Sequence, residues 1–327
     1  MVKIEIDIER CKGCGTCADF CPTSVFELSE INGRKVSSAA RIDDCCACNT
    51  CVGQCPQGAI LLTDEVSEKE YLDSINTGTP AVPLDTEERE SYAKLSKSLE
   101  DILGLRWKPI AVTLISKDTA LPDVPLPRSR LRYCQALMMA RRGETLLMPP
   151  QVHACPDGTH ILGLTSVSPK LATGEIYIKF GKLASIEAAR QMIAERPHLP
   201  EKSVKATLVS PLEKAVIKPD VVVVVAPPES MMWLCMASSF HTGKRFKFKV
   251  SGYNSQCIEA TVYPYTTGEI NISLGCYGCR AASDIGDDMM FMGIPLAKLG
   301  SLVSGLEQLG KKAIPDSRLK IYLPPLV

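Results

Sequence analysis

This sequence of 327 residues lacks the features that mark several large protein classes. It has only four histidines, too few for a histidine-rich metal centre. No Gly-x-Gly-x-x-Gly run opens a helix, so no motif supports a flavin or NAD site. The formal net charge is zero, which argues against nucleic acid as a partner. Its purest apolar run, 221–226, is far shorter than the roughly 20 residues that span a membrane, so no membrane association is expected.

A secretion signal is also missing from the first residues. Residues 2–9 alternate branched apolar and charged side chains, which predicts a half-buried edge strand. We therefore expect a cytoplasmic protein whose fifteen cysteines bind metal clusters rather than form disulfides. Exposed clusters would further favour a host that lives with little oxygen.

The sequence is rich in cysteine. Eight of its fifteen cysteines lie in two copies of one pattern, C-x2-C-x2-C-x3-C-P. The copies consist of Cys11, Cys14, Cys17, Cys21 and Pro22, and of Cys45, Cys48, Cys51, Cys55 and Pro56. This run binds [4Fe–4S] clusters in bacterial two-cluster ferredoxins, where the fourth cysteine of each run ligates the other cluster.

Two clusters follow from this pattern, because structural zinc uses other spacings and a reducing compartment disfavours disulfides. We assign one cluster to Cys11, Cys14, Cys17 and Cys55, and the second to Cys45, Cys48, Cys51 and Cys21. Cys46 falls outside the pattern and is interpreted as a bystander.

Residues 1–65 thus resemble a two-cluster ferredoxin and form the first predicted domain. Asn32-Gly33 predicts a turn between the two runs, and residues 59–62 the closing strand. The domain holds ten acidic and six basic residues, so the rest of the chain carries an excess of four positive charges. This asymmetry favours docking between the two.

A linker, residues 66–85, is predicted next because it lacks a core pattern. An amphipathic helix then begins at Thr86 and ends at Leu103, with Gly104 as its stop. Residues 86–327 are predicted to form a larger α+β domain.

The larger domain contains an internal repeat. The sequence TGEIYIKFG at 173–181 returns as TGEINISLG at 267–275, and we take the second copy as a strand. Each copy follows a predicted strand, at 110–115 and 221–225, and then an apolar helix. The valine-rich strand at 221–225 is expected to be central and buried on both faces.

Two half-domains related by a pseudo-two-fold axis, about 109–218 and 219–312, follow from this repeat. By analogy with other duplicated folds, a site is expected where they meet. The fold class is therefore α+β: a ferredoxin-like two-cluster module followed by a larger duplicated α+β domain.

Short segments spread over residues 104–312 are similar to one known family. They are Arg132-Tyr-Cys134-Gln, Arg142-Gly-Glu, Ala154-Cys155-Pro, Thr173-Gly-Glu, Pro-Leu-Glu-Lys before Ala215, His241-Thr-Gly, Cys257 through Tyr263-Pro-Tyr265, Leu274-Gly-Cys276 with Arg280, and Asp287-Asp288 leading to Gly293-Ile-Pro295. On these residues the larger domain resembles the DUF169 family of archaea and bacteria. The resemblance implies a fold and a site but names no substrate.

The cysteines of this domain form the second candidate centre. Family members resemble one another at Cys134, Cys155, Cys257 and Cys276, whereas Cys235 and Cys279 look particular to this chain. Loop cysteines beside Gly and Pro are placed for ligation, so we expect a third [4Fe–4S] cluster on Cys134, Cys155, Cys257 and Cys276, with Cys279 in reserve. This assignment requires Cys155 and Cys257 to lie close together. A redox dithiol at Cys276 and Cys279 is the rival, and inert burial is favoured for Cys235.

Few other residues qualify as candidates for the site. His241 and Arg280 are expected near the third cluster, as catalytic groups that bind an anionic or polar substrate. His153 and His160 are interpreted as structural. The basic run 244–249 alternates and predicts a strand with a solvated edge, or alternatively a docking strip for the acidic module.

The leading functional hypothesis is a cytoplasmic iron–sulfur redox protein. Its ferredoxin domain would deliver low-potential electrons to the cysteine-bearing site, which would reduce a small molecule or a partner's cofactor. The alternative is a non-catalytic electron carrier or redox sensor whose larger domain binds a partner or ligand. The expected partner is a redox protein or a small electron acceptor, and the sequence leaves enzymatic activity and a homo-oligomer open.

Overall fold

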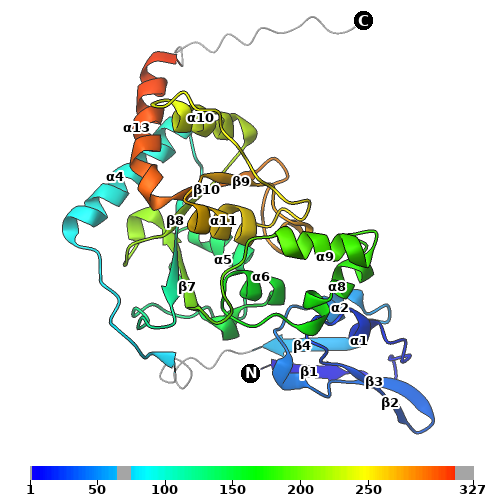
Figure 1. The fold of residues 1–327 in the computed structure, drawn as a ribbon. Helices are drawn as coiled ribbons and strands as arrows, with labels where there is room; N and C mark the ends of the chain where they lie inside the picture. The colour runs from blue at the N-terminus through cyan, green and yellow to red at the C-terminus, as the bar shows by residue number, and fades with distance from the viewer. Residues whose placement is uncertain (1, 65–74, 314–327) are drawn as a thin grey trace, which may run out of the picture.

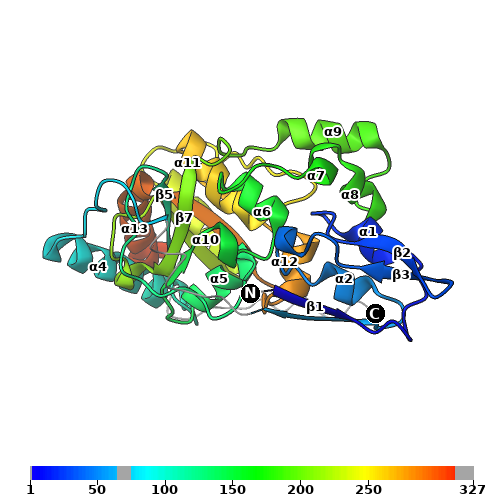
Figure 2. The same ribbon diagram turned by 90° about the horizontal axis from the view of Figure 1, so that it is seen from below.

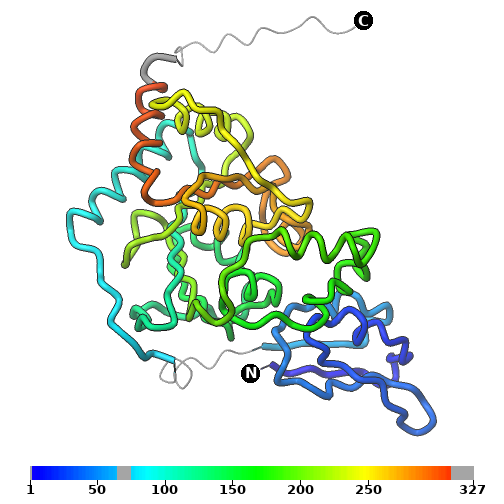
Figure 3. The backbone as a smooth tube through the Cα atoms, viewed as in Figure 1, coloured from blue at the N-terminus to red at the C-terminus, as the bar shows by residue number. Residues whose placement is uncertain are grey.

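The structure, a computed structural model, describes residues 2–64 and 75–313. A small N-terminal part lies against one end of a larger α/β part, as the ribbon and the tube through the Cα atoms both show (Figures 1 and 3). The predicted order, a ferredoxin-like module followed by a larger mixed α and β domain, is confirmed. No helix among the described residues is both long and apolar enough to cross a membrane.

The small part consists of two antiparallel strand pairs and short helices. Its elements are β1 (Val2–Ile6), α1 (Thr16–Phe20), β2 (Glu27–Ile31), β3 (Arg34–Ser38), η1 (Ile42–Asp44), α2 (Thr50–Gln54) and β4 (Ile60–Asp64). Strand β1 pairs with β4, and β2 with β3. Asn32 and Gly33 join β2 to β3 with φ angles of 52° and 74°. The predicted turn is present because this residue pair tolerates two successive left-handed conformations.

A six-stranded sheet forms the centre of the larger part. Its order is β6 (Leu146–Met148), β7 (Val204–Pro211), β5 (Ile110–Ser116), β8 (Val221–Ala226), β10 (Met290–Pro295) and β9 (Asn271–Ser273). Neighbouring strands are antiparallel. All six residues of β8 are buried, as predicted, because helices cover both faces of the sheet.

Three helices cover one face: α4 (Thr86–Leu103), α10 (Pro228–Ser239) and α13 (Leu296–Ala313). They lie at the top and left of the molecule, away from the small part at the lower right (Figure 1). Helix α4 begins at Thr86, as predicted, and the Asp85 side chain caps it by accepting a hydrogen bond from the backbone N–H of Glu88. Gly104 ends it with a φ of 62°, as predicted.

The opposite face packs against α5 and carries the segments that reach the small part. The remaining elements are α5 (Tyr133–Ala140), η2 (Pro150–Val152), α6 (Pro156–Ile161), α7 (Pro169–Ala172), α8 (Glu175–Lys179), α9 (Ile186–Glu195), η3 (Leu212–Lys214), η4 (Ile258–Val262), α11 (Tyr263–Thr267) and α12 (Tyr277–Ala282). Helix α8 lies beside α1 (Figures 1 and 2), and α7 contacts α1 through Lys170 and Ala18. The larger part therefore offers loops and helix ends, not its sheet, to the small part.

The internal repeat does not produce two equal structures. Gly174 and Gly268 are both left-handed, with φ angles of 85° and 67°. Residues 173–181 then continue into α8, whereas 267–275 contain the edge strand β9. The strand order is mirrored about the β5–β8 pair, whereas the two nine-residue copies adopt different conformations.

Two other expectations need correction or fall partly outside the described residues. The strand predicted at 244–249 is wrong, because this run is irregular. Of the predicted linker, residues 66–74 lie outside the described residues. Residues 75–85 run along the larger part, bridging to Thr119 and Ile217.

Candidate functional site

The first cysteine set of the small part surrounds a cavity. Cys11, Cys14, Cys17 and Cys55 all line it. Beside Cys14, Gly13 has a φ of 60°, and a Cβ there would lie 2.3 Å from the Lys35 carbonyl oxygen. The loop can therefore close around the cavity only with glycine at this position. The structure thus places Cys55, the last cysteine of the second run, beside the first three cysteines of the first run.

The second set is also brought together. Burial raises the pKa of Cys51 to about 12, and negative charge on Cys48, Cys45 and Cys21 adds to the increase. These four thiols therefore lie within electrostatic reach of one another. Backbone N–H groups point at sulfur in both sets, from Val25 to Cys21 at 3.3 Å and from Ala59 to Cys55 at 3.4 Å. Four thiols that line a cavity in the first set, four thiols within electrostatic reach in the second, and N–H donors to sulfur in both fit two [4Fe–4S] clusters.

Five thiols of the larger part form a third group. Cys155 precedes α6, Cys257 precedes η4 and Cys276 precedes α12, while Cys134 and Cys279 lie within α5 and α12. Burial raises the pKa of Cys257 well above its usual value, and the charges of Cys155 and Cys276 add to this. The Sγ atoms of Cys276 and Cys279 are 3.1 Å apart, and Cys134 interacts with Cys279. Cys155 and Cys257 therefore lie within electrostatic reach of each other although about a hundred residues separate them.

A buried amide beside this group has no partner among the described residues. Gln256 is 0% exposed, and neither its Nε2 nor its Oε1 has a hydrogen-bond partner. Buried polar atoms in proteins are almost always hydrogen-bonded. Gln256 precedes Cys257, and a Cβ at Gly275, the neighbour of Cys276, would lie 3.5 Å from the Gln256 Nε2, so this amide lies beside the loop that leads to Cys276. Backbone N–H groups also reach Cys155 at 3.4 Å and Cys276 at 3.3 Å.

Arg132 lies between the second and third thiol groups. Its Nη2 donates to the backbone carbonyl of Cys48 at 3.0 Å. Burial lowers the pKa of Arg132, but the negative charges of Cys155, Cys48 and other thiols outweigh this and raise it. A hydrogen bond from Cys46 is the main cause of a Cys48 pKa of about 6. Cys46, predicted to be a bystander, thus lies at this junction.

The small part docks through basic groups of the larger part. Lys170 Nζ donates to the carbonyl oxygens of Ala18 and Cys21 at 2.7 and 3.1 Å, and Lys179 pairs with Asp19 at 2.9 Å. Further along, Arg130 contacts both Asp64 and the Cys45 carbonyl. Phe20 and Phe180 pack with their ring centroids 5.2 Å apart. The charge asymmetry of the sequence is realised here, and the basic run 244–249 is not among these contacts.

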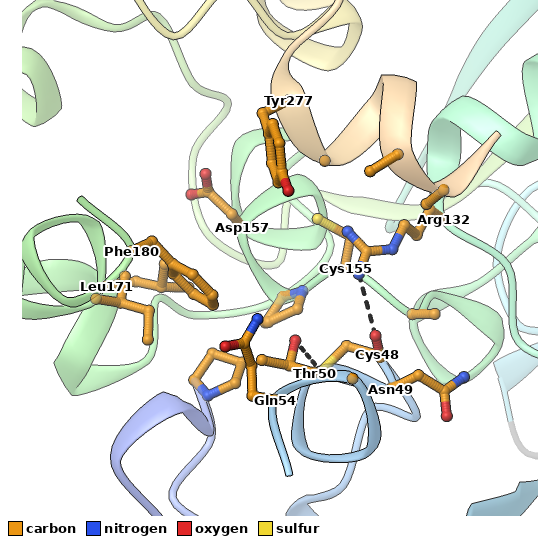
Figure 4. A pocket seen from close by; sticks show the side chains of 18 of the residues that line it. Cys48, Asn49, Thr50, Gln54, Arg132, Cys155, Asp157, Leu171, Phe180 and Tyr277 are labelled. Atoms are coloured by element: carbon orange, nitrogen blue, oxygen red, sulfur yellow. Dashed lines mark hydrogen bonds between the residues drawn. The ribbon is translucent and has the colours of Figure 1, made fainter. Parts of the chain in front are cut away.

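A cavity of about 510 Å³, here called the interface cavity, opens where the two parts meet. From the small part it is lined by Pro22, Cys48, Asn49, Thr50 and Gln54, and from the larger part by residues that include Arg132, Cys155, Asp157, Phe180 and Tyr277. Figure 4 shows Tyr277 and Phe180 directed into it above the loop of Cys48. The cavity therefore borders both the second and the third thiol groups.

Two predicted site residues are not brought to this cavity. His241 is exposed in the turn after α10 and packs against Phe240. The Arg280 guanidinium donates to the carbonyl oxygens of Leu274, Gly286 and Met289, so it holds the loops around α12. Neither residue lines the interface cavity.

Sequence reasoning missed a buried polar group in the cavity wall. Arg196 donates to Asp157 at 2.8 Å and to the Tyr177 hydroxyl at 2.5 Å. Burial raises the pKa of Tyr177 and of neighbouring Tyr253, and the charge of Asp157 adds to both increases. Both phenols therefore stay protonated. The Cys155-Pro-Asp157 sequence was the signal nearest to this group, but nothing local indicated Arg196 or the tyrosines.

Comparisons with known proteins agree with the two parts. Residues 98–305 match the DUF169 family, described as uncharacterised ArCR, and residues 6–60 match a 4Fe-4S dicluster domain. An uncharacterized protein of Methanocaldococcus jannaschii is 29% identical over 215 residues, which cover 65% of this chain and 92% of that protein.

Proposed function

The chain belongs to the DUF169 family and has an N-terminal 4Fe-4S dicluster domain, and we propose that it is a redox protein that delivers electrons to the thiol group of its larger part. In this proposal Cys134, Cys155, Cys257 and Cys276 hold a third [4Fe–4S] cluster, with Cys279 as the reserve ligand. Bound clusters supply one-electron transfer at low potential. The electrons would come from a redox partner protein and reduce a small molecule or a partner's cofactor.

One observation carries the proposal: Arg132 lies close to thiols of both groups. It contacts the Cys48 loop, and the charges of Cys155, Cys134 and Cys276 act on it. A half-buried cation between two negatively charged centres lowers the energy of placing them close together. The docking contacts of Lys170 and Arg130 hold the small part in this position.

An anaerobic count of iron and sulfide on the full chain tests the third cluster. Three cubanes contain about twelve iron atoms and two contain about eight. We expect about twelve in the native chain, about eight in a Cys155→Ser/Cys257→Ser double variant, and about twelve in Cys235→Ser, whose thiol packs on the opposite face of the sheet. About eight in the native chain would rule out the third cluster.

Delivery of electrons has a separate test. Reduced viologen would supply electrons to the full chain in the presence of a panel of small acceptors. We expect turnover in the native chain and its loss in the Cys155→Ser/Cys257→Ser variant. No turnover with any acceptor would favour the non-catalytic carrier or sensor.

A second candidate is a redox dithiol, which the 3.1 Å separation of the Cys276 and Cys279 sulfur atoms favours. Two electrons and two protons would convert a Cys276–Cys279 disulfide to two thiols. This candidate predicts about eight iron atoms in the native chain, and two cysteines that react with an alkylating agent only after reduction. Mass spectrometry of the alkylated chain would identify them.

A further inference from the structure

The interface cavity has the size and composition of a ligand site. Its volume of about 510 Å³ falls within the range of roughly 300–1,000 Å³ for small-molecule pockets. Its walls come from both parts of the chain and mix aromatic rings with a few polar groups, which is typical of such pockets. A molecule held there would lie beside Cys48 and Cys155 at once.

Charge in the cavity favours an anion. Among the described residues that line it, Asp157 has the one carboxylate, and it pairs with Arg196, which is 3% exposed. Arg130 pairs with Asp64. Arg132 and Lys182 also line the cavity, and neither has a carboxylate partner among the described residues. A ligand carboxylate would give the Lys182 ammonium an anionic partner, and it would meet Arg132 beside the thiols whose charges already act on that guanidinium.

Two aromatic rings in the cavity wall, those of Phe180 and Tyr277, favour a flat ligand. Phe180 is held by Phe20, with 5.2 Å between ring centroids. Tyr277 is 71% exposed, which is unusual for an aromatic ring, and it projects into the cavity (Figure 4). The Lys182 ammonium lies 3.5 Å from the centroid of the Tyr277 ring. A flat molecule can stack on these rings while its charged end meets Lys182.

We propose that the interface cavity binds a small planar organic anion of the aromatic or conjugated carboxylate class, with its carboxylate at Lys182 and Arg132 and its plane against Tyr277 and Phe180. This inference depends on the proposed function in one respect: if the chain delivers electrons, this anion is the molecule that accepts them. Binding itself requires no electron transfer, so the two can be tested apart.

Calorimetric titration of the anaerobically purified full chain with benzoate, benzamide and acetate tests the site. Benzamide keeps the ring without the charge, and acetate keeps the charge without the ring. We expect benzoate to bind at least about tenfold more tightly than either, because one charged hydrogen-bonded contact contributes about this factor. The control variant is Lys94→Gln, an exposed lysine on α4 at the other end of the molecule.

Two variants assign the contacts. Lys182→Gln should remove most of the preference for benzoate over benzamide. Tyr277→Leu should weaken both ring compounds about threefold to tenfold and leave acetate unchanged. Both side chains are exposed, so neither change should affect folding, and a thermal unfolding scan would check this.

Three results would overturn the inference. They are equal affinity for benzoate and benzamide, no detectable heat of benzoate binding, and a Lys182→Gln variant with the same benzoate affinity as Lys94→Gln. The iron count does not depend on these results. If the chain has two clusters and still prefers benzoate, the ligand site is supported and the third cluster is excluded. If it has three clusters and no preference for benzoate, the third cluster is supported and the ligand site is excluded.

Discussion

Arg132 donates a hydrogen bond to the backbone carbonyl of Cys48, with 3.0 Å between Nη2 and the oxygen. The two residues belong to different parts of the chain, and Cys155 is close enough for its charge to act on the same guanidinium. This contact joins the ferredoxin-like module to the thiol group of the larger part.

Replacing Arg132 by glutamine should make the second cluster of the small part harder to reduce. A nearby positive charge stabilises the added electron, so its loss should lower the midpoint potential, by roughly 50–100 mV at an effective dielectric constant of about 20. A redox titration followed by electron paramagnetic resonance would measure this. Arg190→Gln, on the exposed face of α9, is the matched control, and an unchanged potential in Arg132→Gln would contradict the prediction.

Cys14→Ala should cost one cluster and much of the order of the small part. The Cys14 side chain is exposed, so its removal leaves no core cavity and the loss would come from the metal. We expect about four fewer iron atoms per chain and a lower unfolding temperature of the small part. Cys235→Ala should keep the full iron content. Unchanged iron in Cys14→Ala would exclude Cys14 as a ligand.

Two lysines at the docking surface should differ in their effect. Lys170→Met leaves the carbonyl oxygens of Ala18 and Cys21 without their donor and should weaken docking by about 1–3 kcal/mol. Lys179→Met removes an exposed ion pair with Asp19 and should cost less than about 1 kcal/mol. Hydrogen exchange of residues 16–22 would report both, and equal protection in the two variants would disagree with this ranking.

Asp220→Asn should stabilise the larger part at neutral pH. Burial raises the pKa of Asp220, whose carboxylate accepts from the Leu114 backbone N–H at 2.7 Å. The folded chain therefore keeps this proton longer than the unfolded chain, and stability falls as pH rises from the ordinary carboxyl pKa through the raised one. Asparagine keeps an acceptor without the charge. Denaturant unfolding should show a gain at pH 7 that shrinks towards pH 3.5, and a gain independent of pH would exclude this cause.

Several features of this protein were determined by local sequence. The C-x2-C-x2-C runs place three thiols on one short loop, so chain geometry alone brings them together. The turn at Asn32-Gly33 and the end of α4 at Gly104 depend on residues that adopt left-handed conformations at low cost. An unbroken run of β-branched valines favours a strand that is buried on both faces, and β8 is central in the sheet.

Tertiary structure decided the rest, because the deciding contacts join residues far apart in the chain. The similar sequences at 173–181 and 267–275 form a helix beside α1 and an edge strand beside β10, since each conformation follows its neighbours. Nothing near His241 or Arg280 in sequence indicated that one is exposed and the other is held by carbonyl oxygens. The interface cavity exists only where both parts meet, so no local pattern could have indicated Tyr277, Lys182 and Cys48 as neighbours of one space.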